Sequence, residues 1–208
     1  QSYYSAMNST GQYVVFTAAG NGFVSGDTGY PQDIILKDLS TGGVTGVTYL
    51  PGLTNGHNFK PSVSDDGSQV AFESLATTLV TGDSNAAKDV FVRNTTTDGT
   101  LRISVDSFDT QANDDSSSPS MSGSGRWVAF SSKASNLVGG DVNALQDIFL
   151  RDRDTNTDTV LDEAGFVSTT LVSLRSVGGV ANGPSASPAI SGDGTQVAFE
   201  SLATDMVA

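Results

Sequence analysis

The 208-residue sequence contains no cysteine, a single histidine and no long apolar segment. Without cysteine, the chain can form neither disulfide bonds nor thiolate metal sites. Its apolar runs are far shorter than a membrane span or the core of a signal peptide, so we expect no membrane insertion. The one histidine, His57, lies in a predicted loop, and we expect it to be solvated rather than catalytic.

Basic residues are also scarce, since 10 Lys and Arg stand against 23 Asp and Glu and give a net charge of −13. This charge repels phosphate backbones and anionic lipid headgroups, so we expect no nucleic-acid partner. Cations, basic protein patches and neutral glycans remain open as ligands. The acidic, lysine-poor composition, with Gln1 rather than methionine at the start, leads us to expect an extracellular or periplasmic location.

What the sequence does contain is an internal repeat. Similar segments recur at intervals of roughly 56 to 69 residues, each carrying one phenylalanine: Phe16, Phe72, Phe130 and Phe199. We treat 1–208 as a single region and divide it into repeats at about 5–60, 61–118, 119–187 and 188–208, the last of which is incomplete.

The second repeat shows the expected strands best. Alternating apolar residues and Asp-Gly turns predict strands at 61–64, 68–74, 89–94 and 100–106, and no segment has helical periodicity. Four-stranded antiparallel units repeated in this way are typical of β-propeller blades. We therefore predict an all-β fold, a β-propeller of four-stranded antiparallel blades with about three full blades plus a half blade. Such a partial ring is either an excerpt of a longer chain or is completed by a neighbour in an oligomer.

The repeat also resembles a known family. The pattern P-x-x-S-x-D-G-x-x-V-A-F-x-S, followed by D-I/V-F-V/L-R-D, is similar to the TolB-type propeller repeat over essentially the whole chain. The first copy departs from the pattern, with Ser5 and Asn8 at the Pro and Ser positions. All copies have longer loops than the family, and we expect the third to carry eleven further residues at about 154–166. The residues that match are Pro61, Ser64, Asp66, Gly67, Ala71, Phe72, Ser74, Pro119, Ser122, Gly125, Ala129, Phe130, Ser132, Pro188, Ser191, Asp193, Gly194, Ala198, Phe199 and Ser201.

An Asp-x-Asn-x-x-x-Asp pattern enters the predicted third strand of two repeats. Hard cations such as Ca²⁺ bind carboxylate and amide oxygens supplied by one short loop, so the pattern indicates a calcium site. Asp and Asn in turns also bond to their own backbone, and this structural interpretation stays open beside the first. A weaker version in the first repeat has Gly29 for Asn. The candidate metal ligands are Asp83, Asn85 and Asp89, then Asp141, Asn143 and Asp147, and finally Asp27 and Asp33.

The resemblance implies a non-enzymatic binding or structural module of a secreted or envelope-associated bacterial protein, which docks a protein or peptide partner. From the Asp-x-Asn pattern we expect its loops to be stabilised by Ca²⁺. Trp127 stands at the position of Gln69, directly before Val-Ala-Phe, and we expect it to pack between blades rather than to stack on a sugar. One alternative is the propeller portion of a hydrolase or a carbohydrate-active enzyme that uses carboxylates such as Asp114, Asp115 or Glu163. Another is a self-associating structural subunit that exchanges strands with a neighbour.

Overall fold

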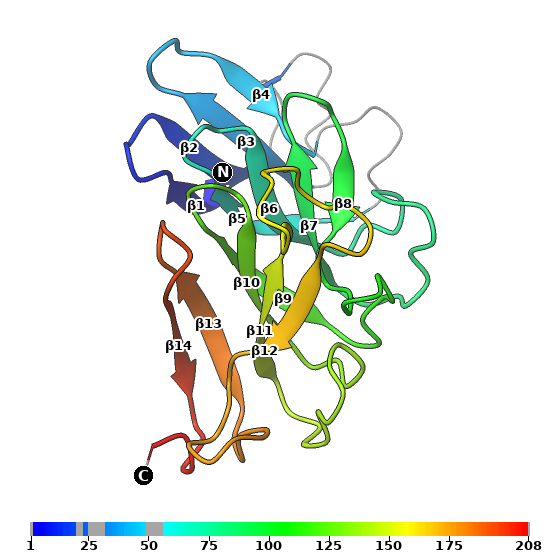
Figure 1. The fold of residues 1–208 in the computed structure, drawn as a ribbon. Coiled ribbons are helices and arrows are strands. Elements are labelled where there is room, and N and C mark those ends of the chain that lie inside the picture. Colours follow the sequence, from blue (N-terminus) through cyan, green and yellow to red (C-terminus); the bar gives the residue numbers. More distant parts are fainter. Residues whose placement is uncertain (1, 20–22, 25–31, 49–55, 208) are drawn as a thin grey trace.

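The computed structural model describes residues 2–19, 23–24, 32–48 and 56–207, and Figure 1 shows it as a fan of twisted sheets. Every regular element in these residues is a β-strand, and they contain no helix that could cross a membrane. The all-β prediction is therefore confirmed.

The strands form three complete four-stranded antiparallel blades and one two-stranded half blade, as predicted. Within each blade the strands pair in chain order, so that every blade is a simple meander. The first blade contains β1 (Ser2–Met7), β2 (Tyr13–Ala18), β3 (Asp33–Asp38) and β4 (Val44–Gly46). The second contains β5 (Asn58–Val63), β6 (Gln69–Ser74), β7 (Asp89–Asn94) and β8 (Thr100–Arg102). The third contains β9 (Ser116–Met121), β10 (Trp127–Ser132), β11 (Asp147–Asp152) and β12 (Ser168–Leu171), and the half blade contains β13 (Ser185–Ile190) and β14 (Val197–Ser201).

The first strands of successive blades lie side by side, β1 against β5, β5 against β9 and β9 against β13. The fourth strands β4, β8 and β12 lie at the opposite edges of their sheets. The first strands therefore line the inner edge of the fan. The outer edge of β14 pairs with no other described strand, and the expected self-association would involve this edge and stays a prediction.

Apolar side chains fill the spaces between the blades. One cluster packs the first blade on the second and includes Ile34 and Phe72, and another packs the second on the third and includes Val92 and Phe130. The repeated phenylalanines stack across paired strands, Phe72 on Phe91 at 5.9 Å between ring centroids and Phe130 on Phe149 at 5.8 Å. Such aromatic pairs contribute about 0.5–1.5 kcal/mol beyond their buried area.

The predicted bounds of the first and fourth strands of the second blade were wrong. β5 begins three residues before Pro61, because a bulge with shifted register and a left-handed Lys60 (φ 46°) lets the strand accommodate a proline, which has no N–H. β8 ends at Arg102 rather than at residue 106, since the chain turns there to form the isolated bridge between Val105 and Gln111.

The extra residues of the third repeat lie between β11 and β12, as predicted. The insertion is attached to the blade by the buried guanidinium of Arg153. Its Nη1 donates to the Gly125 carbonyl at 2.7 Å, and its Nε and Nη2 donate to the carboxylate of Asp162.

Neighbouring blades also meet where a large side chain covers a glycine. A Cβ added at Gly67 would lie 2.7 Å from the Tyr13 ring, and one at Gly194 would lie 2.0 Å from the Trp127 ring. Gly125 meets Gln69 in the same way, and all three glycines have positive φ. The prediction that Trp127 packs between blades is confirmed.

We expect Gly67→Ala to destabilise the protein more than Gly82→Ala. Both glycines have φ near +75°, so each alanine carries a left-handed strain of roughly 1–2 kcal/mol. Gly82 faces open space, whereas the new methyl at position 67 must displace the Tyr13 ring, at a further cost of about 1–3 kcal/mol. Urea denaturation of both variants measures the difference. Equal losses would contradict the role of this contact between blades.

An aspartate caps the turn between the first two strands in two of the blades. Asp66 accepts bonds from Ser64 Oγ at 2.6 Å and the Ser68 backbone N–H at 2.9 Å. Asp193 makes the matching bonds in the half blade, and its Ser191 and Thr195 hydrogen bonds lower its pKa to about 2. The third blade has Ser124 at this position, and its weaker hydroxyl contact to Ser122 is 3.4 Å.

We therefore expect Ser124→Asp to raise the melting temperature by on the order of 2 °C at neutral pH, because it restores the cap. A carboxylate with a lowered pKa stabilises the fold above its unfolded pKa of about 4 and loses that effect as the pH falls toward 2. The gain should accordingly vanish between pH 4 and 2. Calorimetry across this range measures it, and a gain that persists at pH 2 would argue against a capping carboxylate.

Candidate functional site

In each of the three full blades, the third strand begins with a buried Asp that accepts a hydrogen bond from a side-chain hydroxyl. The Asp89 carboxylate accepts a hydrogen bond from Ser104 Oγ at 2.6 Å, and Asp147 accepts one from Ser173 Oγ at 2.6 Å. In the first blade, Thr48 Oγ1 donates to Asp33 at 3.0 Å. Each of these hydroxyl oxygens also accepts a hydrogen bond from the backbone N–H of the residue that follows the Asp. These residues are Val90, Ile148 and Ile34.

Sequence reasoning missed this hydroxyl partner. Thr48, Ser104 and Ser173 each lie two residues after the fourth strand, where an alignment of the fourth strands would have found them. Because each hydroxyl joins the third strand to the chain beyond the fourth, this Asp–hydroxyl contact closes the outer part of the blade.

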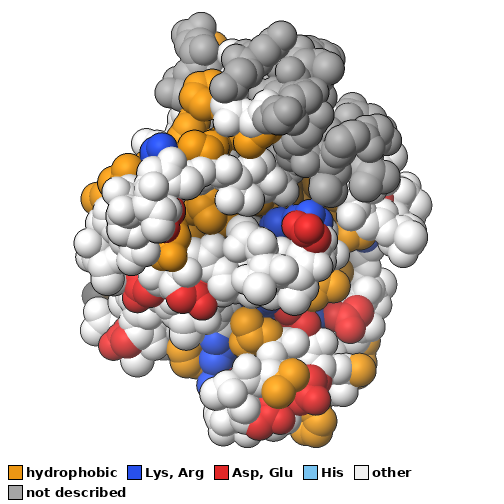
Figure 2. Space-filling view, turned by 90° about the horizontal axis from the view of Figure 1, so that it is seen from above, with side chains coloured by type: hydrophobic (Ala, Val, Ile, Leu, Met, Phe, Trp, Pro, Cys, Tyr) orange, Lys and Arg blue, Asp and Glu red, His pale blue; other side chains and the backbone are white. Residues whose placement is uncertain are grey.

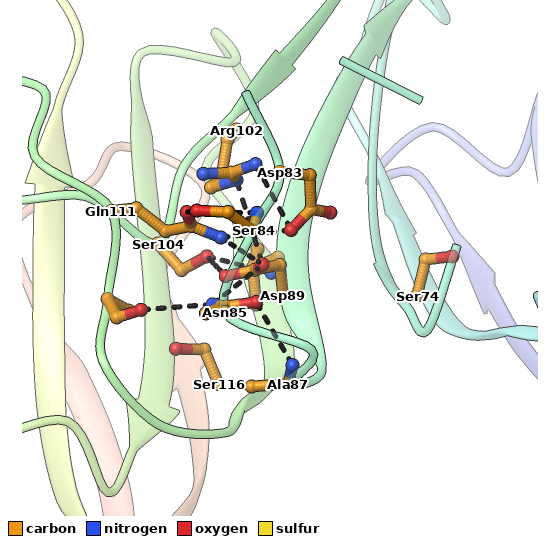
Figure 3. Close-up of polar contacts among 12 residues, drawn as sticks. Ser74, Asp83, Ser84, Asn85, Ala87, Asp89, Arg102, Ser104, Gln111 and Ser116 are labelled. Carbon is orange, nitrogen blue, oxygen red and sulfur yellow. Dashed lines mark hydrogen bonds and ion pairs between the residues drawn. The ribbon is translucent and has the colours of Figure 1, made fainter. Parts of the chain in front are cut away.

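Both Asn residues of the repeated pattern form Asx turns. Asn85 Oδ1 accepts the Ala87 N–H at 3.0 Å, and its Nδ2 donates to Asp89 at 3.1 Å (Figure 3). Asn143 does the same with Leu145 at 2.8 Å and Asp147 at 2.8 Å. The amide oxygens are therefore already used within the loop, in agreement with the turn interpretation.

In the second blade, a cation lies beside the carboxylates of Asp83 and Asp89, and a side-chain amide donates hydrogen bonds to both. Arg102 lies beside both, with Nη2 3.4 Å from Asp83 Oδ1 and Nε 3.6 Å from Asp89 Oδ2. Gln111 Nε2 donates to Asp83 at 2.9 Å and to Asp89 at 3.4 Å (Figure 3). Burial raises the pKa of Asp89, and Ser104, Arg102 and Asn85 oppose this effect.

In the third blade the same positions are apolar. Leu171 pairs with Phe149 as Arg102 pairs with Phe91, and the bridge from Leu174 to Val180 replaces the one that ends at Gln111. Among the described residues, no Lys or Arg forms an ion pair with Asp141 or Asp147.

Asp141 is only 7% exposed, and its Oδ1 has no hydrogen-bond partner. Burial and then the negative charge of Asp147 raise the pKa of Asp141, while the Asn143 backbone amide lowers it.

In the first blade, Asp27 lies outside the described residues, so only Asp33 can be placed. Within the described parts of the chain, no group of three or more His, Cys, Asp or Glu side chains is arranged to hold a metal ion. Hydrogen bonds join the candidate Asn residues to the Asp at the start of the third strand, Asn85 to Asp89 and Asn143 to Asp147. The assignment of the candidate Asp and Asn residues to calcium stays a prediction.

Carboxylates named for an enzymatic alternative engage separate partners. Asp115 accepts the Lys88 N–H at 2.9 Å, the exposed Asp114 accepts the Asp115 N–H, and Glu163 accepts a bond from Asn156. Acidic side chains are spread over the face seen in Figure 2. His57 is half-buried, in contrast to the solvated side chain expected, because its Nδ1 accepts the Gln32 backbone N–H at 3.3 Å.

A small pocket of about 220 Å³ lies at the inner edge of the fan, and its lining comes from all four inner strands. Lys60 Nζ donates to Ser118 Oγ at 2.8 Å and lies 3.9 Å from Glu73, which also accepts the Ser118 N–H at 2.7 Å. These bonds tie the second blade to the third at the pocket. The pocket is lined by Tyr4, Ser5, Lys60, Pro61, Ser118, Pro119 and Pro188.

We expect Ser104→Ala to lower the free energy of unfolding by about 2–3 kcal/mol, because it leaves a buried carboxylate oxygen and the Val90 N–H without their partner. Ser104→Thr keeps the hydroxyl, as Thr48 does in the first blade, and we expect it to cost about 1 kcal/mol or less. Urea denaturation compares the two. Equal losses would show that side-chain volume, and not the hydroxyl, matters at this position.

No family model matches the chain, and no curated protein matches it. Solved structures do: TolB from Acinetobacter baumannii is 19% identical, over 96% of this chain and 37% of its own, with a TM-score of 0.54. Dipeptidyl peptidase 4 from Porphyromonas gingivalis is 14% identical over 98% of this chain and 29% of its own, with a TM-score of 0.50. Hydrazine synthase from Kuenenia stuttgartiensis is 12% identical over 90% of this chain and 27% of its own, with a TM-score of 0.51.

The chain therefore spans far less than two thirds of the length of each of these proteins, and the low identities show the fold alone. Because the TolB structure matches across nearly all of the described blades, the chain has the fold of a TolB-like β-propeller, with three complete blades and half of a fourth.

Proposed function

We propose that the chain is a non-enzymatic binding or structural module that docks a protein or peptide partner at the inner edge of its blades. The fold supports this proposal, because propellers bring short segments of several blades together around one axis. It does not fix the function, which has to be argued from the site.

The inner pocket is the observation that carries the proposal. Each inner strand contributes one residue with left-handed backbone, Tyr4 (φ 40°), Lys60 (φ 46°), Ser118 (φ 55°) and Ser187 (φ 53°). Non-glycine residues in this conformation are strained, and such strain gathers at ligand sites. Here it is repeated in every blade at the edge where the strands meet.

The lining of the pocket suits an extended peptide. The Tyr4 side chain is 53% exposed and lies edge-on to Phe59, with ring centroids 6.4 Å apart. Prolines on three strands add flat apolar surface, and the ammonium of Lys60 offers one cation to a peptide carboxylate or carbonyl. An aromatic surface with few, well-placed polar groups is the usual composition of a peptide-binding site.

We further propose that the module belongs to a secreted or envelope-associated bacterial protein and works outside the cell or in the periplasm. The acidic, cysteine-free composition supports this location, and the bacterial source of the similar TolB structure fits it. Calcium bound by the loops is the stabilising ion that we propose, and the buried Asp141 Oδ1 without a hydrogen-bond partner supports this for the third blade.

A displayed peptide library selected on the 208-residue chain tests the docking proposal. We expect peptides whose affinity, measured by titration calorimetry, falls at least about tenfold in Tyr4→Asn and Lys60→Asn, since one truncated anchor costs about 1.4 kcal/mol or more. Asn keeps the left-handed backbone at both positions. Leu101→Ala, on the outer strand β8, is the control and should bind unchanged. Selected peptides that bind all four proteins equally would place docking elsewhere.

A further inference from the structure

We propose that the third blade binds one hard divalent cation, Ca²⁺, at Asp141 and Asp147, and that the second blade replaces this cation with the side chain of Arg102. The loops of the two blades are near copies in sequence and in hydrogen bonding. They differ in what neutralises the buried carboxylates.

The first observation is the exchange of neutralising groups between equivalent positions. In the second blade, Arg102 lies within 3.6 Å of both carboxylates, and the Gln111 amide bridges them. In the third blade, the structurally equivalent residues are Leu171 and Val180, whose side chains neither donate a hydrogen bond nor carry a charge. The pair of acidic residues remains, while the cation and the amide are both lost.

The second observation is the buried, unpartnered oxygen of Asp141. Its Oδ1 accepts no hydrogen bond, and the residue is 7% exposed. An ionised carboxylate buried without a partner is costly, and a bound cation at this oxygen would offset that cost. In the second blade, the Oδ1 of Asp83 contacts both Arg102 and Gln111.

The chemistry of the donors favours Ca²⁺ over other metals. All available ligands are oxygens, which suit hard cations, and the site has neither histidine nor cysteine. Asn143 is not a ligand in this scheme, because its Oδ1 accepts the Leu145 N–H and its Nδ2 donates to Asp147. With two carboxylates, and backbone carbonyls and water to complete the shell, we expect weak binding at about 10⁻⁴–10⁻³ M, in the range of extracellular calcium modules.

Calcium titration of the 208-residue chain provides the test. We expect the melting temperature of the wild type to rise by roughly 3–6 °C when Ca²⁺ exceeds its dissociation constant tenfold, and chelation with EDTA to reverse the rise. Asp141→Asn, which keeps the shape of the side chain, should lose one bound Ca²⁺ per chain in calorimetry. The matched variant Asp83→Asn should keep the calcium stoichiometry of the wild type.

Exchanging the neutralising residues between the blades tests the replacement directly. Leu171→Arg with Val180→Gln gives the third blade an internal cation and should abolish its calcium response. Arg102→Leu with Gln111→Val should give the second blade a calcium response and add one bound ion per chain.

Three results would overturn the proposal: a wild-type chain that binds no Ca²⁺, an Asp141→Asn variant that keeps the full stoichiometry, or an Asp83→Asn variant that loses an ion. If the Leu171→Arg double variant does not fold, the single Asn variants still decide between the two loops. The readout is calcium bound per chain, so the outcome is independent of the docking proposal.

Discussion

The fold depends on the contact between one blade and the next. A four-stranded sheet buries only the faces that it packs against its neighbours. Phe72 belongs to the apolar cluster between the first two blades, and Phe130 to the cluster between the second and the third. Where Tyr13 and Trp127 cover glycines of the following blade, the contact is close enough that no Cβ would fit without movement. The side chain and the glycine lie in different blades, so each of these contacts fixes how one sheet is placed against the next.

The loops outside this packed centre are held by a second, polar contact. A buried Asp at the start of each third strand accepts a hydrogen bond from a hydroxyl beyond the fourth strand, in all three complete blades. A buried carboxylate requires such partners, because its desolvation is otherwise uncompensated. This demand explains why the Asp recurs while much of the loop sequence around it changes.

Each of these two loops has a second aspartate, Asp83 or Asp141, whose negative charge lies near that of the first. The two blades differ in the groups that surround this second charge. The second blade places the Arg102 guanidinium beside Asp83 and Asp89, whereas the third has Leu171 at the equivalent position and an Asp141 Oδ1 without a hydrogen-bond partner. Of two loops with similar sequences, one thus has an internal cation beside its carboxylates and the other does not. The difference comes from strands and bridges that are remote from the loop in sequence.

The sequence by itself determined the fold class, the number of blades and the positions of most strands. The Phe, Pro, Asp and Gly residues recur with the period of the blade, and strand alternation and turn formation can be recognised from neighbouring residues alone. It also indicated that Trp127 packs between blades. Only the tertiary structure decided what surrounds the loop carboxylates, since Ser104, Arg102 and Gln111 reach Asp89 across a turn and a strand. The insertion between β11 and β12 shifts the matching positions in the third blade, so the replacement of Arg102 by Leu171 becomes visible only when the paired strands are superimposed in space. Periodic local patterns can be read along a chain, whereas the neutralisation of a buried charge depends on residues that the fold brings together.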